Sequence, residues 1–317
     1  ITPAYGKFTK HGVTVAADAL SDWNKVEQRY DEKRGLTKGR RLGCQACVQS
    51  DVVIDVPAES QVHQQVIRKD ASARSVKMNP ATRLFYVEVG EPDMHEPSGD
   101  FERVKTALKD QWGISDVELD FFQFNKLQKT LRKGNWAITV AIFKDHTATP
   151  PRIIEIWPGL YEKGLFGLAI DLGSTTIAAH LTDLKSGDVI KSAGLMNPQI
   201  RFGEDLMSRV SYSMMNQGGD KEMTAVVREA INSLAEQLRT EAGIEKNSLV
   251  EVVFVCNPVM HHLLLGIDPV ELGQAPFALA SSNSIAVSAS NLGLETMNPS
   301  GRCYILPCIA WHVGADA

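Results

Sequence analysis

The chain has 317 residues, of which 44% are hydrophobic and 22% are charged, and its formal net charge is −5. This composition is typical of a globular protein with two or three domains. The negative charge argues against nucleic acid or an anionic membrane as a partner, and no apolar run approaches the roughly 18–20 residues of a membrane span. Five cysteines, an odd number, without a secretory signal favour free thiols in a reducing cytoplasm.

The first two blocks of the chain give few signals of regular structure. Residues 1–58 are polar up to RRLGCQACVQSDVVIDVP, in which Val52 to Val56 predict a short strand that Pro57 ends. Residues 59–82 have few large apolar side chains and no clear period, which predicts a linker.

The third block, residues 83–163, alternates strands with helices. The apolar runs RLFYVEV (83–89), NWAITVAIF (135–143) and RIIEIWP (152–158) predict strands. One helix is expected to start with Ser98 as its N-cap, and a second is expected to end at Gly134. The block predicts a small α/β domain, and no residue pattern in it indicates catalysis.

The fourth block, residues 164–317, opens with GLAIDLGSTTIAAHLTDLKSGDVI, which predicts a β-hairpin over 167–190. A helix over 222–242 and strands at 249–256 and 303–311 are expected to follow. The pattern is that of a larger α/β domain.

The first bend of this hairpin contains Asp171-Leu172-Gly173-Ser174-Thr175-Thr176. A glycine allows the backbone to approach an anion closely, and the hydroxyl and N–H groups of such a turn can bind phosphate oxygens. A carboxylate beside the turn can orient Mg²⁺ or its water shell. The alternative is an ordinary hairpin with a Ser/Thr-rich turn. The hexamer resembles the first phosphate motif of the actin, sugar-kinase and heat-shock-chaperone ATPase superfamily.

Three later stretches carry less specific signals. Asp205 and Arg209 lie four residues apart, so on a solvated amphipathic helix they could form an ion pair. His261 and His262 are adjacent and would point about 100° apart on a helix, which makes them a poor metal pair. Gly314-Ala315-Asp316 follows a strand and could form a second phosphate loop.

Taken in order with the DLGSTT turn, these stretches resemble one family, the reductive activators of corrinoid proteins. The family shows segments of the form NPQ…FG.D..SR, MHHL..G.DP…L…APF and P…A..VGAD. The matching residues here are Asn197, Pro198, Gln199, Phe202, Gly203, Asp205, Ser208 and Arg209; Met260 to Leu263, Gly266, Asp268, Pro269, Ala275, Pro276 and Phe277; and Pro307 with Val313 to Asp316. The resemblance covers residues 165–317.

The resemblance implies a multi-domain α/β protein. Its expected parts are the C-terminal part of a [2Fe–2S] ferredoxin-like β-grasp domain (1–58), a linker (59–82), a small α/β middle domain (83–163) and the first half of an actin-like, ribonuclease H-like ATPase domain (164–317). The implied activity is the ATP-dependent return of a Co(II) corrinoid to Co(I) by electron transfer from the cluster. The implied partners are a corrinoid or methyltransferase protein and a reductant, and a homodimer stays open.

The resemblance also implies roles for individual residues. Asp171 would be the catalytic residue that serves Mg²⁺, and Cys44 would bind the cluster as the cysteine of an LxCQ motif. The residues implied to bind ATP are Gly173, Ser174, Thr175, Thr176, Gly314 and Asp316.

The cysteines do not complete a cluster site in this chain. Plant-type spacing requires three cysteines upstream of the last one, and residues 1–43 contain none. Cys44 and Cys47 form a CxxC pair, but zinc would need two more ligands, so inert thiols are favoured. We therefore expect a chain truncated at both ends, which alone would neither hydrolyse ATP nor transfer electrons.

Three alternatives stay open. A small-molecule kinase uses the same hairpin but normally begins with it, whereas here residues 1–164 precede it. An activator of another low-potential enzyme would use cysteines inside the ATPase domain, but Cys256, Cys303 and Cys308 lie on or beside apolar strands, as core cysteines do. The third alternative is a non-enzymatic docking module.

Overall fold

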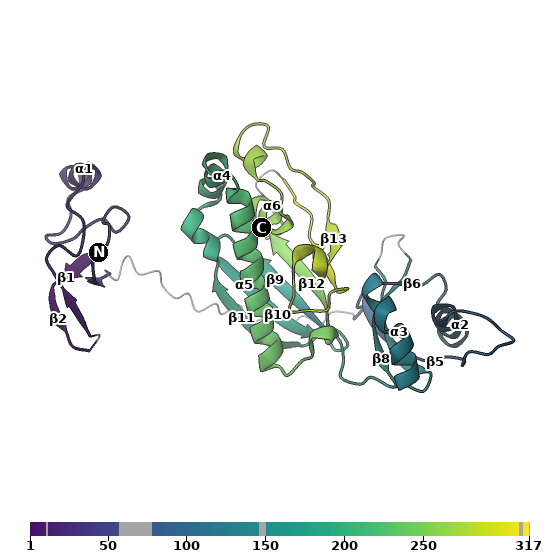
Figure 1. Ribbon diagram of the computed structural model, residues 1–317. Helices are drawn as coiled ribbons and strands as arrows, with labels where there is room; N and C mark the ends of the chain where they lie inside the picture. The colour runs from purple at the N-terminus through teal and green to yellow at the C-terminus, as the bar shows by residue number, and fades with distance from the viewer. Residues whose placement is uncertain (11, 57–77, 146–149, 311–312, 317) are drawn as a thin grey trace. The chain divides into compact units, whose positions relative to one another are not determined.

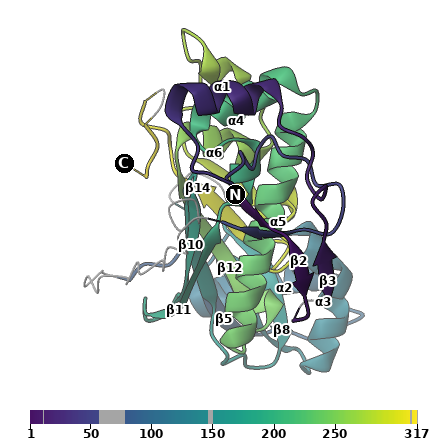
Figure 2. The same ribbon diagram turned by 90° about the vertical axis from the view of Figure 1, so that its left-hand side faces the viewer.

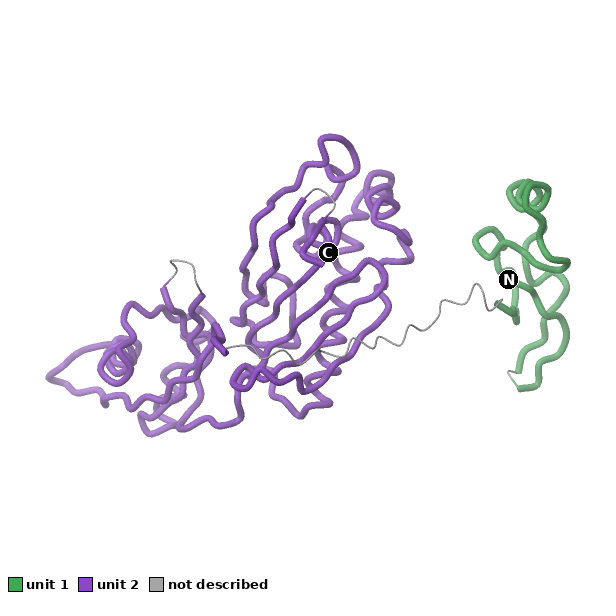
Figure 3. Tube along the Cα trace, turned by 180° about the vertical axis from the view of Figure 1, so that it is seen from behind, with its two compact units in different colours: residues 1–66 green, residues 67–317 purple. Residues whose placement is uncertain are grey.

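The computed structural model describes residues 1–10, 12–56, 78–145, 150–310 and 313–316. The chain divides into two compact units, residues 1–66 and 67–317 (Figure 3). The predicted linker lies for the most part in residues 57–77, outside the described residues, as does the strand end predicted at Pro57. The mixed α/β class is confirmed, because both units combine strands with helices.

In its described residues, 1–10 and 12–56, the N-terminal unit contains four very short strands and one helix. β1 pairs with β4 and β2 pairs with β3, both antiparallel. β4 confirms the strand predicted from the Val/Ile run, while the other three strands lie in a polar stretch that gave no strand signal. The elements are β1 (Thr2–Ala4), β2 (Gly6–Phe8), β3 (Val13–Val15), α1 (Lys25–Arg34) and β4 (Val53–Asp55).

The second unit begins with a four-stranded sheet of order β5-β7-β8-β6, with α2 and α3 packed against it (Figure 1). The elements are β5 (Thr82–Glu88), α2 (Asp100–Trp112), β6 (Glu118–Leu119), α3 (Phe121–Lys133), β7 (Ala137–Phe143) and β8 (Arg152–Pro158). The helix end predicted at Gly134 is confirmed. The N-cap predicted at Ser98 is wrong. Gly99 takes the cap position, because the helix begins one residue later, and no side chain caps its first turn.

A six-stranded sheet of order β11-β10-β9-β12-β14-β13 forms the rest of this unit. β9, β10 and β11 form an antiparallel meander, and β9, β12 and β14 run parallel. The strands are β9 (Phe166–Leu172), β10 (Thr176–Asp183), β11 (Val189–Met196), β12 (Leu249–Cys256), β13 (Ile285–Ser288) and β14 (Arg302–Ile305). The helices are η2 (Pro198–Phe202), α4 (Leu206–Met215), α5 (Gly219–Glu241), η3 (Lys246–Ser248), α6 (Pro258–Leu265), η4 (Val270–Gly273) and η5 (Ala289–Leu292).

The long helix α5 covers one face of this sheet (Figure 1). Met223, Val227, Ile231, Leu234 and Leu238 recur at helical spacing and are buried in one cluster with the inward-facing residues of the strands. α4 and α6 lie against the first half of α5 (Figure 2). None of the helices in the described residues is both long and apolar enough to cross a membrane.

Direct polar contacts join the two sheets of the second unit. The Glu251 carboxylate accepts the Thr82 N–H at 2.6 Å, and Ser300 donates its hydroxyl to Asp120 at 2.7 Å. A small apolar cluster lies at the same junction: Ala141, Ile154, Leu165 and Val250. The four-stranded sheet therefore packs on the N-terminal half of β12, the strand whose other end reaches the candidate site.

Candidate functional site

Asp171 lies near the carboxyl end of β9, beside the end of the parallel strand β12. The register pairs Asp171 with Val255 and Leu172 with Cys256. The Asp171 side chain is half-buried, whereas its neighbours Ile170 and Leu172 are buried in the core. In open α/β sheets, ligands bind outside the carboxyl ends of parallel strands, so this is the expected edge for a binding site.

The predicted phosphate turn, Gly173 to Thr176, is the tight connection between β9 and β10. The Gly173 N–H donates to the Thr176 carbonyl at 3.0 Å. A Cβ on Gly173 would lie 2.7 Å from that carbonyl oxygen, so only glycine fits without moving the backbone. Thr175 is exposed and Ser174 is half-buried, which leaves both hydroxyl side chains at the surface of the turn.

The second predicted loop lies against the end of β12. A Cβ on Gly314 would be 2.0 Å from the Cys256 carbonyl oxygen and 2.7 Å from an Asp316 carboxylate oxygen. Burial raises the pKa of the Cys256 thiol, and the nearby charges of Asp316 and Asp171 raise it further. Asp171 and Asp316 are therefore both close to Cys256, at the same edge of the sheet.

The residues gathered at this edge suit the phosphates of a magnesium nucleotide. A turn with a glycine and three hydroxyl residues offers N–H and O–H donors to phosphate oxygens. Two carboxylates near the turn suit a Mg²⁺ ion that keeps most of its water ligands. Among the described residues, no group of three or more His, Cys, Asp or Glu side chains is arranged to hold a metal ion.

One residue at this edge was missed by sequence reasoning. Arg209 was expected to pair with Asp205 on a solvated helix, but it is fully buried and points behind the phosphate turn. Its guanidinium donates to the Ser174 carbonyl and, at 3.0 Å, to the Gly203 carbonyl. Asp205 instead caps α4 by accepting the Ser208 N–H at 2.7 Å. The only sequence signal for Arg209 was its place in the family segment.

The two adjacent histidines lie inside the core. His261 and His262 are both buried in α6. His262 uses both ring nitrogens, one against the Pro258 carbonyl at 2.8 Å and the other to accept the Ala280 N–H at 3.1 Å. Burial lowers the pKa of His261 to about 4, so its ring is neutral at neutral pH. These residues support the core behind the site.

The three cysteines of the second unit are also core residues. Cys256, Cys303 and Cys308 are all buried, and burial raises the pKa of each thiol. Protonated, buried thiols are poor nucleophiles and poor metal ligands. The expectation that they belong to the core is confirmed.

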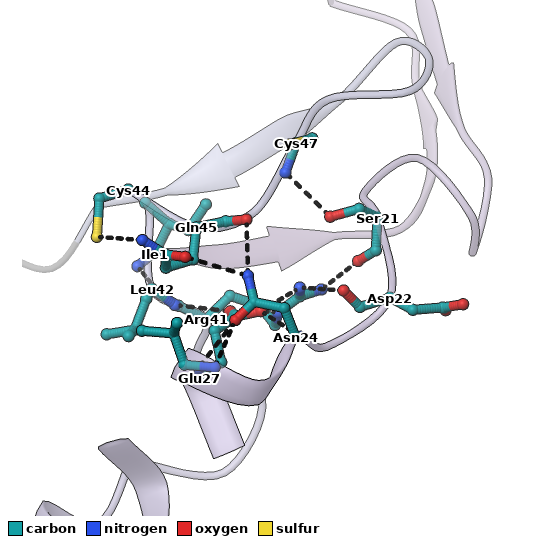
Figure 4. A network of polar contacts seen from close by, with 11 residues as sticks. Ile1, Ser21, Asp22, Asn24, Glu27, Arg41, Leu42, Cys44, Gln45 and Cys47 are labelled. Carbon is teal, nitrogen blue, oxygen red and sulfur yellow. Dashed lines mark hydrogen bonds and ion pairs between the residues drawn. The ribbon is translucent and has the colours of Figure 1, made fainter. Parts of the chain in front are cut away.

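Cys44 and Cys47 lie in the N-terminal unit, on an exposed loop (Figure 4). The Cys47 N–H donates to the Ser21 hydroxyl at 3.0 Å, and the Leu42 N–H donates to Glu27 at 3.1 Å. The loop is therefore fixed at both ends while both thiols face outward. A [2Fe–2S] cluster needs four ligands, and these are the only cysteines of the unit. The two thiols alone do not fit a cluster.

A buried ion pair anchors this loop. Arg41 donates to the two Glu27 carboxylate oxygens at 2.8 and 2.7 Å, and Glu27 also completes the capping box of α1 with Asn24 (Figure 4). The Arg41 hydrogen bonds hold the pKa of Glu27 below its ordinary value. Glu27 therefore stabilises the unit above its ordinary pKa, and this contribution is lost as the pH falls through the lowered folded value.

We expect Glu27→Gln to destabilise the N-terminal unit by about 2–4 kcal/mol, because Arg41 keeps its charge without a carboxylate. Trp23, which lies under the Arg41 guanidinium, reports unfolding through its fluorescence in denaturant titrations. Glu32→Gln on the exposed face of the same helix is the control. Equal stability of the two variants at pH 7 would contradict this assignment.

Comparisons with known proteins agree with the sequence resemblance. A family model described as RACo middle region matches residues 166–317, and one described as RACo linker region matches residues 71–163. The corrinoid activation enzyme RamQ of Eubacterium limosum is 30% identical over 166 residues, which is 52% of this chain and 28% of that protein.

A solved structure agrees with these matches. The reductive activator for corrinoid, iron–sulfur protein is 30% identical with a TM-score of 0.68, and the match covers 93% of this chain and 49% of that one. The chain thus spans about half of that solved relative and less than a third of the curated one. Both family models, the curated relative and the solved fold point to the same group, and the chain belongs to the family of reductive activators of corrinoid proteins.

Proposed function

We propose that the protein uses MgATP to return an inactive Co(II) corrinoid, carried by a methyl-transfer protein, to Co(I). The observation that carries this proposal is the phosphate-type turn, Gly173 to Thr176, placed beside Asp171 and Asp316 in a chain of this family. Membership of the family supports the corrinoid as the target, and the turn supports ATP as the source of free energy.

In this proposal, the turn binds the β- and γ-phosphates through its N–H and hydroxyl groups. Asp171 and Asp316 orient the water shell of the Mg²⁺ ion that accompanies the nucleotide. Reduction of Co(II) to Co(I) adds one electron and is difficult, so the nucleotide must favour a conformation of the complex in which the corrinoid accepts that electron more readily. Such coupling requires that ATP bind the two conformations with different affinities.

The junction between the two sheets offers a route for this coupling. β12 carries Glu251, which contacts the four-stranded sheet, near one end and Cys256, which contacts the Gly314 loop, at the other. These residues lie five positions apart, roughly 17 Å along an extended strand. A shift of the loop on nucleotide binding would therefore reach the four-stranded sheet through a single rigid element.

The electron donor is proposed on the family resemblance alone. Cys44 would supply one ligand of a [2Fe–2S] cluster. The two cysteines of this unit do not provide the full set of four ligands. We assign no electron-transfer step to the exposed loop, because two thiols do not complete a cluster. A cytoplasmic location is proposed from the free cysteines.

Nucleotide binding is the first test of this proposal. Equilibrium dialysis of the full-length protein with ATP, with and without Mg²⁺, is expected to show saturable binding that strengthens with the metal. Absence of binding at millimolar ATP would overturn the proposal, since no free energy would then be available from the nucleotide. An ATP affinity that does not change when Mg²⁺ is added would overturn the role of the two carboxylates.

A further inference from the structure

Three consecutive carbonyl groups of the phosphate turn are held from the same side. The Gly173 carbonyl accepts the Asn197 side-chain amide at 2.8 Å, and the Thr175 carbonyl accepts the Asn197 backbone N–H at 2.8 Å. Between them, the Ser174 carbonyl accepts the Arg209 guanidinium. Asn197 and Arg209 together therefore fix the orientation of every peptide group in the turn.

This orientation decides where the N–H groups point. A trans peptide is planar, and its N–H points opposite to the carbonyl of the preceding residue. The N–H groups of Ser174, Thr175 and Thr176 thus point away from Asn197 and Arg209. In the described part of the chain, no acceptor receives the N–H of Ser174 or Thr175. Successive N–H groups that point outward form an anion-binding nest.

Arg209 is an unusual residue to place behind such a turn. It is fully buried, and its hydrogen-bond acceptors are neutral: the carbonyls of Ser174 and Gly203, the Gln199 side-chain oxygen at 3.2 Å and the Met260 sulfur at 3.2 Å. Burial lowers the pKa of Arg209 to about 10, so the side chain stays cationic at neutral pH. Asp205 acts on this charge from an exposed position, and a buried cation is costly without a close counter-charge. An anion on the outer side of the turn would supply one.

Further contacts hold the side chains of Asn197 and Arg209 in place. The Asn197 oxygen accepts the Gln199 N–H at 3.0 Å, which sets the direction of its amide. Gln199 donates to the Met223 carbonyl of α5 at 2.9 Å while its oxygen accepts Arg209. Gly203 has no room for a side chain, since a Cβ would lie 2.6 Å from the Ser208 side chain. A continuous set of contacts therefore runs from α5 to the turn.

We propose that Arg209 and Asn197 are positioning residues for nucleotide phosphate: they turn three carbonyls inward so that three N–H groups face the anion, and the buried Arg209 charge favours that anion. The inference rests on the proposed function, because it takes the phosphate of MgATP as the anion. Neither residue touches the nucleotide. Both act through the backbone of the turn.

The test compares MgATP affinity with thermal stability in the full-length protein. Arg209→Met is expected to weaken MgATP binding roughly 10- to 100-fold, the effect of losing charge-assisted hydrogen bonds that hold the turn. Arg209→Lys keeps the charge but not the planar fork, so an intermediate affinity is expected. Arg228→Met is the matched control: Arg228 is half-buried and donates to the Leu264 carbonyl at 2.9 Å, away from the turn. Its affinity should stay within about twofold of wild type.

A second variant tests the same role if Arg209→Met does not fold, which a missing cooperative unfolding transition would show. Asn197→Ser keeps a side-chain oxygen that can cap η2 but removes the longer amide group whose NH2 donates to the Gly173 carbonyl. It is expected to weaken MgATP binding about 10-fold. Hydrogen exchange of the Gly173 amide, which donates to the Thr176 carbonyl inside the turn, should accelerate without nucleotide in both turn variants and not in Arg228→Met.

The outcomes separate this inference from the proposed function. If wild type binds MgATP and the folded turn variants bind it equally well, the positioning role is overturned while the proposed function stands. An equal loss of affinity in Arg228→Met would also overturn it, because the loss would then follow general destabilisation. If wild type does not bind MgATP, the proposed function fails, and the inference fails with it.

Discussion

Asp171→Asn is expected to abolish ATP-dependent corrinoid reduction, with a loss on the order of 100-fold, as for removal of one preorganised electrostatic contact. The carboxylate lies half-buried at the carboxyl end of β9, beside the turn. An amide keeps its size but cannot supply the negative charge that orients hydrated Mg²⁺. The measurement is the initial rate of Co(I) formation at saturating MgATP with a Co(II) corrinoid protein.

The matched control for this variant is Asp183→Asn. Asp183 ends β10 and uses its carboxylate to accept the N–H groups of Lys185 and Ser186 in the opposite turn of the same meander. Its loss should lower stability slightly and leave the rate at saturating MgATP within about twofold. If Asp171→Asn retained more than half of the wild-type rate, the role assigned to Asp171 would be wrong.

Lys126→Met is expected to destabilise the second unit by about 2–3 kcal/mol, since it leaves the buried Glu155 carboxylate without its cation. Glu155 is 1% exposed, pairs with Lys126 of α3 and accepts the Asn298 side-chain amide at 2.7 Å. Asn298 belongs to the half of the unit that contains the six-stranded sheet. The variant should therefore weaken the junction of the two sheets, which thermal denaturation at pH 7 would measure.

The pH dependence of this variant gives a sharper check. Burial raises the pKa of Glu155 even with Lys126 present. A raised folded pKa means that the native state binds the proton more tightly, so stability falls as the pH rises through that value. Without Lys126 the pKa rises further, and the loss should be smaller at pH 5 than at pH 7.5. Lys129→Met, on the exposed side of α3, should cost under about 0.5 kcal/mol at both pH values. A loss in Lys126→Met that grows at acid pH would contradict this account of Glu155.

The buried strands of both sheets were the most predictable part of the fold, but the strand predicted over 303–311 was too long, because β14 covers only Arg302–Ile305. β8 and β12 have the bounds that their apolar runs RIIEIWP and LVEVVFVC predict, because buried strands need continuous apolar sequence. β11, with a mostly exposed, mixed sequence, and β13, with four residues, gave no such signal. Both are edge strands, and each forms by pairing with one neighbour in the sheet, β11 with β10 and β13 with β14.

Only the DLGSTT turn of the candidate site could be proposed from local sequence patterns. The DLGSTT turn could be read locally, because glycine and hydroxyl residues after an apolar strand have a direct physical use. The role of Arg209 could not, since spacing on a helix says which residues lie on one face but not whether that face is buried. The contact of Glu155 with Asn298, 143 residues away, depends entirely on how the two sheets pack. Such contacts follow from tertiary structure, which local patterns do not encode.

The most direct test of the central claim is the visible spectrum of a Co(II) corrinoid protein, mixed anaerobically with the full-length protein and a low-potential reductant. Conversion to Co(I) is expected when MgATP is present, and little conversion is expected with reductant alone or with MgADP. Conversion at the same rate and extent without nucleotide would contradict this expectation, because the Asp171 edge would then have no part in the reaction. Absence of conversion despite intact MgATP binding, across several corrinoid partners, would contradict the corrinoid as the target.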